Sequence, residues 1–318
     1  MTTPRFGALL MTYGSPTSLD DVPRYLAAVR GGRPADEETT AEFVRRYRVI
    51  GGSPLVAITS AQAAAVEAAL GGRVLARPAM RFSAPTIEDA LRELAGAGAE
   101  RVATIVLSPQ YSPLIMGGYG RAVDAALTTL AEDGLAAPEI VPVGAWHEEP
   151  GFVEALATRI REALDRLPDG EAAAPVLLTA HSLPRHVADR EPDYLDQLTA
   201  TATAVATAAG LDETRWRFCW QSAGHEPGEW MTPDFADLMP ILAREGHGSV
   251  VVAPVQFLAD HLEILYDIDI GAREQAEAAG LRFARIESLN TMPRFIEALA
   301  SIVERALAAQ PTGATGRA

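Results

Sequence analysis

The sequence predicts an α/β protein of two similar lobes, each a four-stranded parallel sheet flanked by helices. Three observations support this prediction. Apolar runs of strand length alternate with amphipathic stretches of helical length, which is the pattern of repeated βαβ units. Four such runs lie in each half of the sequence. The chain has 318 residues and is 48% hydrophobic, which is enough to build two cores.

The expected elements follow one another in regular alternation. The strands are Phe6–Tyr13, Val74–Phe82, Arg101–Ser108 and Glu139–Ala145, then Pro175–His181, Arg215–Trp220, Ser249–Phe257 and Leu281–Ile286. Helical periodicity is clearest over Ala61–Leu70, Ile87–Leu94, Phe152–Leu167, Tyr194–Ala209, Phe235–Arg244 and Met292–Leu307. We expect one lobe over residues 1–146, a second over 147–290, a hinge near residues 146–150, and a frayed tail after the last helix.

Composition narrows the classes of function. The formal net charge of −15, from 27 basic and 42 acidic residues, argues against a general nucleic-acid or anionic-membrane surface. All 27 basic residues are arginines, which excludes lysine Schiff-base chemistry and a P-loop lysine. The single cysteine, Cys219, excludes a disulfide framework and a cysteine-based cluster within one chain, and fits a reducing compartment. The first apolar run is too short for a signal peptide or membrane span, so we expect a cytoplasmic protein without stable membrane insertion.

A histidine ends the fifth expected strand. The segment VLLTAHSLP reads as a buried strand that stops at His181, with Pro184 ending the pairing. Ligands of parallel α/β sheets bind beyond the carboxyl ends of the strands. His181 is therefore expected in the crevice between the lobes, where a neutral imidazole can bind a metal or accept a proton. A core or turn histidine with satisfied hydrogen bonds is the alternative.

Carboxylates follow the seventh expected strand, in the segment FLADHLEILYDID. Glu263 and Asp267 are four residues apart and share a helix face that begins at the same sheet edge. A carboxylate there can hold a hard cation or take protons. The structural alternative is a capping box, with Asp260 as N-cap and Glu263 three residues later. Whether Asp267 and Asp269 form a second metal site or a solvated face is left open.

Arginines gather in the first fifth of the chain. They are Arg30, Arg33, Arg45, Arg46 and Arg48, and glycine pairs lie beside them. Such a cluster suits several carboxylates or phosphates, and its alternative is a set of surface ion pairs with the acidic residues at 36–42. Tyr13 ends the first strand, so it also faces the expected crevice.

The segments described above resemble the ferrochelatase family over nearly the whole chain. The resembling pieces, in order, are LLMTYGSP, IGGSPLVAIT, LSPQYSP, LTAHSLP, CWQSAGHEP, PVQFLADHLEILYDID and SLNTMPRFIEAL. The similarity is greatest to the Gram-positive type that acts on coproporphyrin III. The resemblance implies a chelatase-like fold of two Rossmann-like lobes around a porphyrin cleft. It also implies that the C-terminal helix, within residues 291–318, packs back on the first lobe.

The resemblance implies a lyase that inserts Fe²⁺ into coproporphyrin III during heme biosynthesis. His181 corresponds to the metal-side histidine and Glu263 to its partner carboxylate, and Tyr13 faces the metal from the opposite side as a candidate ligand of the product iron. Porphyrin contacts are implied for Tyr13, Arg30, Arg46, Tyr47, Ser53 and Tyr119. No organic cofactor and no iron–sulfur cluster are implied, and Fe²⁺ is a substrate. We expect a monomer whose partners are the porphyrin and, transiently, neighbouring enzymes of the heme pathway.

Three other functions remain open from the sequence. The enzyme could load protoporphyrin IX, or another tetrapyrrole with cobalt or nickel, because histidine and glutamate select weakly among such metals. It could be a heme-binding protein of the same fold without turnover, or a two-lobed sugar- or nucleotide-binding protein. The polar segment at residues 32–40, GRPADEETT, would not enter a bilayer, which favours the more water-soluble coproporphyrin.

Overall fold

Both halves of the chain fold into the same kind of sheet. The computed structural model describes residues 6–168, 173–224 and 228–309. Parallel strands lie in the order β2-β1-β3-β4 in the first lobe and β6-β5-β7-β8 in the second. Their bounds are β1 (Phe6–Thr12), β2 (Val74–Met80), β3 (Arg101–Val106), β4 (Glu139–Pro142), β5 (Val176–His181), β6 (Trp216–Gln221), β7 (Ser249–Pro254) and β8 (Arg282–Arg285). The predicted fold class is confirmed.

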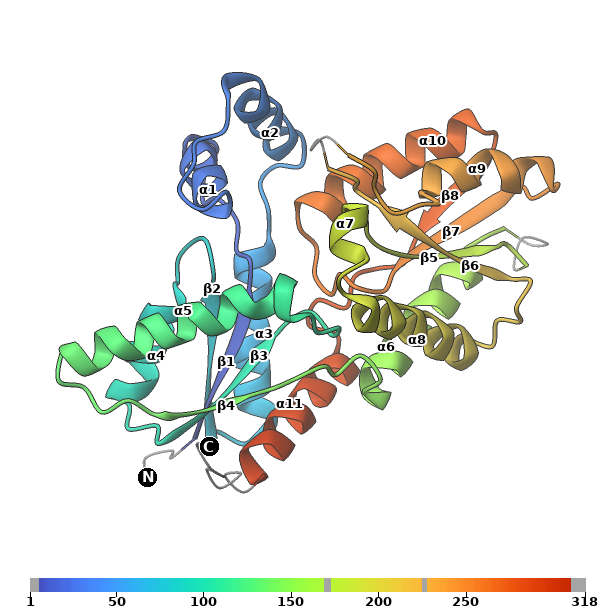
Figure 1. Ribbon diagram of the computed structural model, residues 1–318. Helices are drawn as coiled ribbons and strands as arrows, with labels where there is room; N and C mark the ends of the chain where they lie inside the picture. The colour runs from blue at the N-terminus through green and yellow to red at the C-terminus, as the bar shows by residue number, and fades with distance from the viewer. Residues whose placement is uncertain (1–5, 169–172, 225–227, 310–318) are drawn as a thin grey trace.

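Helices flank both sheets (Figure 1). The longer ones are α3 (Leu55–Ala69), α4 (Ile87–Gly96), α5 (Pro113–Glu132), α6 (Pro150–Asp165), α8 (Pro192–Ala209), α9 (Phe235–Arg244) and α11 (Pro293–Ala308). The remaining elements are η1 (Leu19–Asp21), α1 (Val22–Val29), α2 (Glu37–Val49), α7 (Arg185–Ala188), the π-helix η2 (Glu263–Ala272) and α10 (Arg273–Ala278). None of the helices in the described ranges is both long and apolar enough to cross a membrane.

Local sequence signals explain where several helices begin. The Asp36 side chain accepts a hydrogen bond from the Thr39 backbone at 2.7 Å and so starts α2. Thr86 and Asp89 form a reciprocal capping box at the start of α4. These contacts satisfy backbone N–H groups that the first helical turn leaves without a partner.

The main difference from the sequence prediction is the pair of helices α1 and α2. Only Tyr47 is fully buried in the 13 residues of α2, so no apolar stripe reveals this helix. Helix α3 begins at Leu55, six residues before its expected start. Strands β4 and β7 end at Pro142 and Pro254, earlier than expected, because proline cannot donate to the strand ladder.

The largest hydrophobic core joins the two lobes. It contains Leu10 of β1 and Val176 of β5, together with buried residues of α6 and α11. Trp146 packs edge-on against Phe152 at 5.3 Å and is stacked near Phe295 at 6.3 Å between ring centroids. Helix α11 contacts α3 and β3 of the first lobe as well as α6. The segment expected to be a hinge is therefore well packed; the tail expected beyond residue 309 lies outside the described ranges.

The strand order defines where a ligand is expected. In each sheet the first strand lies between the second and the third. The second strand is therefore added on one side of the first strand, and the third strand is added on its other side. Such switch points open a crevice at the carboxyl ends of the strands. Tyr13 follows β1 directly, and His181 is the last residue of β5. Both residues therefore stand at the switch point of their own sheet.

Candidate active site

The ring of His181 has a fixed orientation. Its Nδ1 lies 2.5 Å from the carbonyl oxygen of Ser182, and its backbone N–H donates to Gln256 Oε1 at 2.8 Å. Gln256 in turn donates to the hydroxyl of Tyr194 at 2.5 Å. The nitrogen that faces a carbonyl carries the proton, so in the neutral form of the ring Nε2 presents a lone pair. The side chain is 31% exposed, so Nε2 can reach a metal or a proton.

Glu263 begins η2 and lies between two histidines. Its Oε2 is 3.7 Å from Nε2 of His181 and 3.9 Å from Nε2 of His261. This oxygen is buried and accepts no hydrogen bond of normal length from the described residues. Burial raises the pKa of Glu263, but the two histidines outweigh burial and lower the pKa to about 2. Glu263 is therefore an ionised carboxylate with one oxygen left for a ligand.

His261 is a site residue that sequence reasoning missed, although it lies within the DHLE segment. Its Nδ1 is 2.9 Å from the carbonyl oxygen of Ala259, and its ring packs edge-on against Phe257 at 4.6 Å. Burial lowers the pKa of His261, but Glu263 outweighs burial and raises the pKa above its usual value. His261 is thus the neighbour whose positive charge helps to keep Glu263 ionised.

The spacing of His181 and Glu263 suits a shared cation. Two donor atoms around one tetrahedral metal with bonds of about 2.0–2.2 Å stand about 3.3–3.6 Å apart, close to the observed 3.7 Å. Among residues 6–168, 173–224 and 228–309, no group of three or more His, Cys, Asp or Glu side chains is arranged to hold a metal ion. His181 and Glu263 thus supply two donor atoms at a spacing that one tetrahedral metal can bridge.

The other acidic residues of the π-helix already have partners. The Asp267 carboxylate lies 3.5 Å from Arg46, and burial raises its pKa while a hydrogen bond from Ser222 lowers it. Asp269 is bound by Arg285 through two hydrogen bonds of 2.7 and 2.9 Å. The bidentate pairing commits both oxygens of Asp269. The structure therefore gives no support to a second metal site formed by these two aspartates.

The capping-box alternative for Glu263 is wrong. The residue before η2 is Leu262, and no side chain caps this helix. The Asp260 carboxylate instead accepts hydrogen bonds from Ser288 Oγ at 2.7 Å and Asn290 Nδ2 at 2.9 Å. Glu263 is consequently free of a capping role and points toward the histidines.

Tyr13 belongs to an aromatic cluster on the first lobe. Its ring centroid is 5.0 Å from that of Phe82 and 6.3 Å from that of Tyr119. Tyr13 is 42% exposed, whereas Tyr119 is buried. Burial raises the pKa of Tyr13, Arg81 lowers it, and Glu263 raises it again. Tyr13 of the first lobe and Glu263 of the second are therefore electrostatically coupled.

Arg81 is the second site residue that sequence reasoning missed. Its guanidinium carbon lies 4.6 Å from the ring centre of Phe82, 5.4 Å from that of Tyr119 and 6.0 Å from that of Tyr13. A Cβ on Gly118 would lie 1.9 Å from Arg81 Nη2, so the guanidinium rests directly against this glycine. No carboxylate among the described residues pairs with Arg81. Arg81 directly follows β2, so the strand-end rule that identified Tyr13 applies to it too.

Helices α1 and α2 form a lip that closes against the π-helix. Arg46 reaches Asp267 and lies 5.0 Å over the ring of Tyr266. Arg45 donates a hydrogen bond to the hydroxyl of Tyr266. Tyr47 is buried beside Leu262. Burial raises the pKa of Tyr47, and the nearby charge of Glu263 raises it further. The lip therefore connects the first lobe to the metal-side helix.

The last two predicted porphyrin contacts lie at the ends of this lip. Arg30 is exposed at the end of α1. Ser53 lies between α2 and α3, where its Oγ accepts a hydrogen bond from the Leu55 backbone at 3.4 Å. The structure thus brings His181 and Glu263 together and gathers Tyr13 and Tyr119 in an aromatic cluster on the first lobe, while the remaining predicted contacts lie on or beside the lip.

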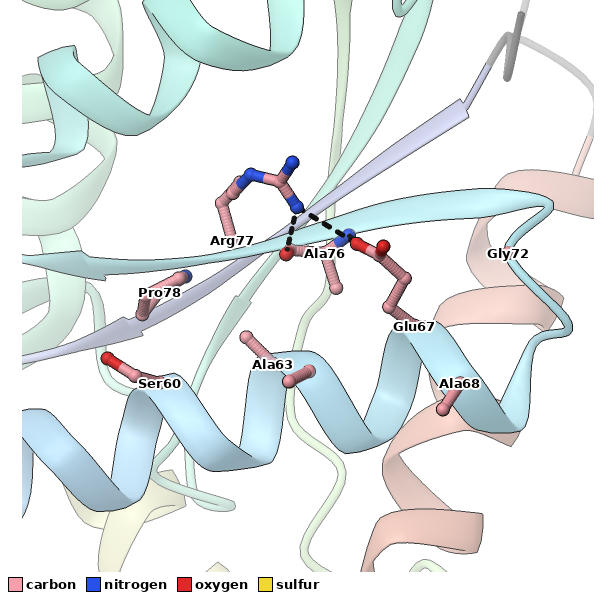
Figure 2. A pocket seen from close by; sticks show the side chains of 9 residues that line it. Ser60, Ala63, Glu67, Ala68, Gly72, Ala76, Arg77 and Pro78 are labelled. Carbon is pink, nitrogen blue, oxygen red and sulfur yellow. Dashed lines mark hydrogen bonds and ion pairs between the residues drawn. The ribbon is translucent and has the colours of Figure 1, made fainter.

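A separate groove runs between α3 and the edge strand β2 (Figure 2). Small side chains such as Ala63 and Ala68 line it, and Arg77 pairs there with Glu67 at 2.9 Å. The Glu67 carboxylate also accepts a hydrogen bond from the Ala76 backbone at 2.9 Å. The groove is lined by none of the predicted site residues, and its polar groups serve to protect the sheet edge.

Comparisons with known proteins identify the family of the chain. A family model described as "Ferrochelatase" matches residues 5–307. The chain is 40% identical over 304 residues to a Deinococcus radiodurans protein named "Ferrochelatase". This alignment covers 94% of this chain and 95% of the relative. The chain is 37% identical over 310 residues to "Coproporphyrin III ferrochelatase" of Geobacillus thermodenitrificans. That alignment covers 95% of this chain and 96% of the relative.

Solved structures of low sequence identity share the fold. CbiX, described as the terminal enzyme for biosynthesis of siroheme in denitrifying bacteria, aligns with a TM-score of 0.56 at 16% identity, covering 95% of this chain and 99% of CbiX. SirB from Bacillus subtilis, solved with Fe³⁺, aligns with a TM-score of 0.57 at 12% identity and covers 96% of both chains. At these identities the likeness supports the fold alone.

Proposed function

The chain belongs to the ferrochelatase family, whose members insert a metal into a porphyrin, and from that premise we propose that it inserts Fe²⁺ into coproporphyrin III. The observation that carries the proposal is the pair formed by His181 Nε2 and the Glu263 carboxylate, 3.7 Å apart. This pair can hold a divalent cation and can also accept protons.

Insertion must exchange one Fe²⁺ for the two protons carried by the pyrrole nitrogens. His181 and Glu263 supply only two ligands, so the four ring nitrogens can replace them as the metal moves inward. The vacated His181 Nε2 and Glu263 carboxylate are then the nearest bases for the two departing protons. Tyr13 lies on the opposite side and is a candidate ligand of the product iron. No redox step is required, and we propose that no organic cofactor takes part.

The absence of an iron–sulfur cluster and the cytoplasmic location remain parts of the proposal. Cys219 is fully buried in β6, and burial strongly raises the pKa of its thiol. Metal binding requires the thiolate, so this residue is a poor cluster ligand. We also propose that the protein is a monomer that makes transient contacts with neighbouring heme-pathway enzymes. These two proposals rest on the sequence resemblance alone.

Arg81 is proposed to attract the carboxylates of the porphyrin. Its guanidinium lies beside Tyr13 and Tyr119 in a chain of net charge −15, and no described carboxylate neutralises it. An arginine in this position offers a fork that matches a carboxylate. Most other arginines near the site, such as Arg45 and Arg46, already pair with Glu42.

Replacing Arg81 by methionine is expected to raise KM for the porphyrin about tenfold, which corresponds to about 1.4 kcal/mol of lost binding. The kcat should stay within about twofold, since Arg81 lies away from the metal-side pair. Steady-state kinetics with varied porphyrin would measure both constants. Arg92→Met is the matched control, because Arg92 pairs with Glu88 and Asp133 on the surface. An unchanged KM in the Arg81 variant would remove Arg81 from the binding site.

We expect a higher kcat/KM for coproporphyrin III than for protoporphyrin IX. Coproporphyrin carries four propionates, and the rim supplies the exposed Arg30 in addition to Arg81. The exposed segment at residues 32–40 is polar and acidic, so it offers no apolar surface to the vinyl groups of protoporphyrin or to a bilayer. Anaerobic Fe²⁺ insertion, followed by absorbance with the two porphyrins in competition, tests the preference. A higher kcat/KM for protoporphyrin IX, or activity that depends on added lipid, would overturn it.

A further inference from the structure

Asn290 is the only asparagine in the chain, and its backbone conformation is unusual. Its φ is +43°, and Ser222 is the one other non-glycine residue with a positive φ in the described ranges. Asparagine tolerates this left-handed region better than most residues, but the conformation persists only where the surroundings hold it. Strained residues of this kind cluster at functional sites, which directs attention to what Asn290 contacts.

The amide and backbone of Asn290 hold the segment that carries the metal-side residues. Its Oδ1 accepts a hydrogen bond from the Asp260 backbone at 3.0 Å, and its Nδ2 donates to the Asp260 carboxylate at 2.9 Å. Its own backbone N–H donates to the carbonyl of Leu258 at 2.9 Å. Asparagine suits this position because its side chain has both an acceptor and a donor.

The hydrogen bonds of Asn290 stabilise a segment that has no regular secondary structure. Between the end of β7 at Pro254 and the start of η2 at Glu263, the backbone forms neither strand nor a full helical turn. Asp260 is further bound by Ser288 at 2.7 Å and Arg285 at 3.4 Å. The position of Glu263, three residues later, therefore depends on side-chain contacts to Asp260.

Asn290 also contacts the first lobe. Its backbone carbonyl accepts a hydrogen bond from Nε2 of Gln62 in α3 at 2.8 Å. The Gln62 side chain is buried, so this bond is shielded from water. A continuous path thus runs from α3 through Asn290 to Asp260, next to His261 and Glu263.

We propose that Asn290 is a positioning residue that fixes the segment from Asp260 to Glu263 relative to the first lobe. It acts through Asp260 and does not itself touch the metal. The inference rests on the proposed function, because its effect is on metal insertion. The proposed porphyrin contacts Tyr13, Arg81 and Tyr119 belong to the first lobe, so loss of the Asn290 amide should affect the metal side and spare porphyrin binding.

The direct test compares Asn290→Gly with Asn290→Ala. Glycine adopts the left-handed backbone without strain but lacks the amide, whereas alanine loses both. We expect Asn290→Gly to lower kcat/KM for Fe²⁺ by about 10- to 100-fold, the usual effect of losing a partner behind a metal ligand. The Kd for coproporphyrin III, measured by fluorescence quenching, should stay within about twofold. Alanine should lower activity similarly and lower the Tm further.

Gln62→Met tests the contact with the first lobe, and Gln110→Met is its matched control. Gln62 and Gln110 are both buried, and each Nε2 donates across the lobes while its Oε1 has no hydrogen-bond partner among the described residues. Gln110, however, donates to Thr201 at 2.9 Å rather than to Asn290. We expect similar losses of Tm, but a fall in kcat/KM for Fe²⁺ of about threefold or more only for Gln62→Met.

The possible failures are distinguishable. A wild-type chain that inserts no metal would refute the proposed function. With an active wild type, an Asn290→Gly variant that is folded and fully active would refute the positioning role. If Asn290→Gly does not fold, the two glutamine variants decide, and equal activity of Gln62→Met and Gln110→Met would overturn the inference.

Discussion

Replacing His181 by alanine is expected to lower kcat for metal insertion by about 10²- to 10⁴-fold, the range that one positioned acid–base group contributes. The variant loses the Nε2 lone pair that Ser182 and Gln256 hold toward Glu263. It should fold normally, because the side chain is 31% exposed and does not fill the core. Porphyrin affinity should change little, since the ring binds metal and protons rather than carboxylates.

Stopped-flow or steady-state insertion assays, with the Tm measured in parallel, would test this expectation. His247→Ala is a matched control, because His247 is a 35% exposed histidine that lies 3.8 Å from Glu245. Its activity should equal that of the wild type. A folded His181→Ala enzyme with normal kcat would show that this histidine has no part in the chemistry.

Replacing Glu263 by glutamine is expected to lower kcat by about 10²-fold or more and to raise KM for Fe²⁺. Glutamine has a similar shape, but it cannot accept a proton and binds a hard cation weakly. Because the variant leaves the first lobe unchanged, KM for the porphyrin should be retained. Glu277→Gln on the exposed face of α10 provides a control with the same change in charge.

The same variant predicts a change in acid stability. The folded-state pKa of Glu263 is lowered to about 2 from a usual value of 4.5, so its ionised form stabilises the folded protein. This contribution is fully present above about pH 4.5 and is lost as the pH falls toward 2. The wild type should therefore lose more stability than Glu263→Gln across this window. Equal pH dependence in the two proteins would contradict the charge assignment.

The fold was largely predictable because buried parallel strands have a strong apolar signal. The segments ending at Tyr13 and His181 are almost wholly buried, and both were expected as strands. Helices α1 and α2 were not predicted, because their apolar residues contact a narrow surface formed partly by Leu262 and Tyr266 of the other lobe. No local sequence pattern predicts a packing contact with residues more than 200 positions away.

The site was predicted in part by the rule that ligands lie at strand ends. The rule singled out Tyr13, His181 and Glu263, and the structure brings His181 and Glu263 within 3.7 Å and places Tyr13 directly after β1. Arg81 obeys the same rule but was missed, because it fell inside a strand that was expected to extend through Phe82, whereas β2 ends at Met80. Asn290 could not be found from the sequence, since its role depends on hydrogen bonds to Asp260 and Gln62 that only folding creates. The π-helical form of η2 likewise has no signal in apolar periodicity.

Tyr13 and His181 occupy counterpart positions in the two lobes. One directly follows β1 and the other ends β5, and these strands hold the same place in two sheets of identical order. The two lobes therefore present a phenol and an imidazole from equivalent scaffolding. If the proposed function holds, the two faces of the porphyrin would differ through residue identity at a shared topological position. The framework by itself treats both positions alike.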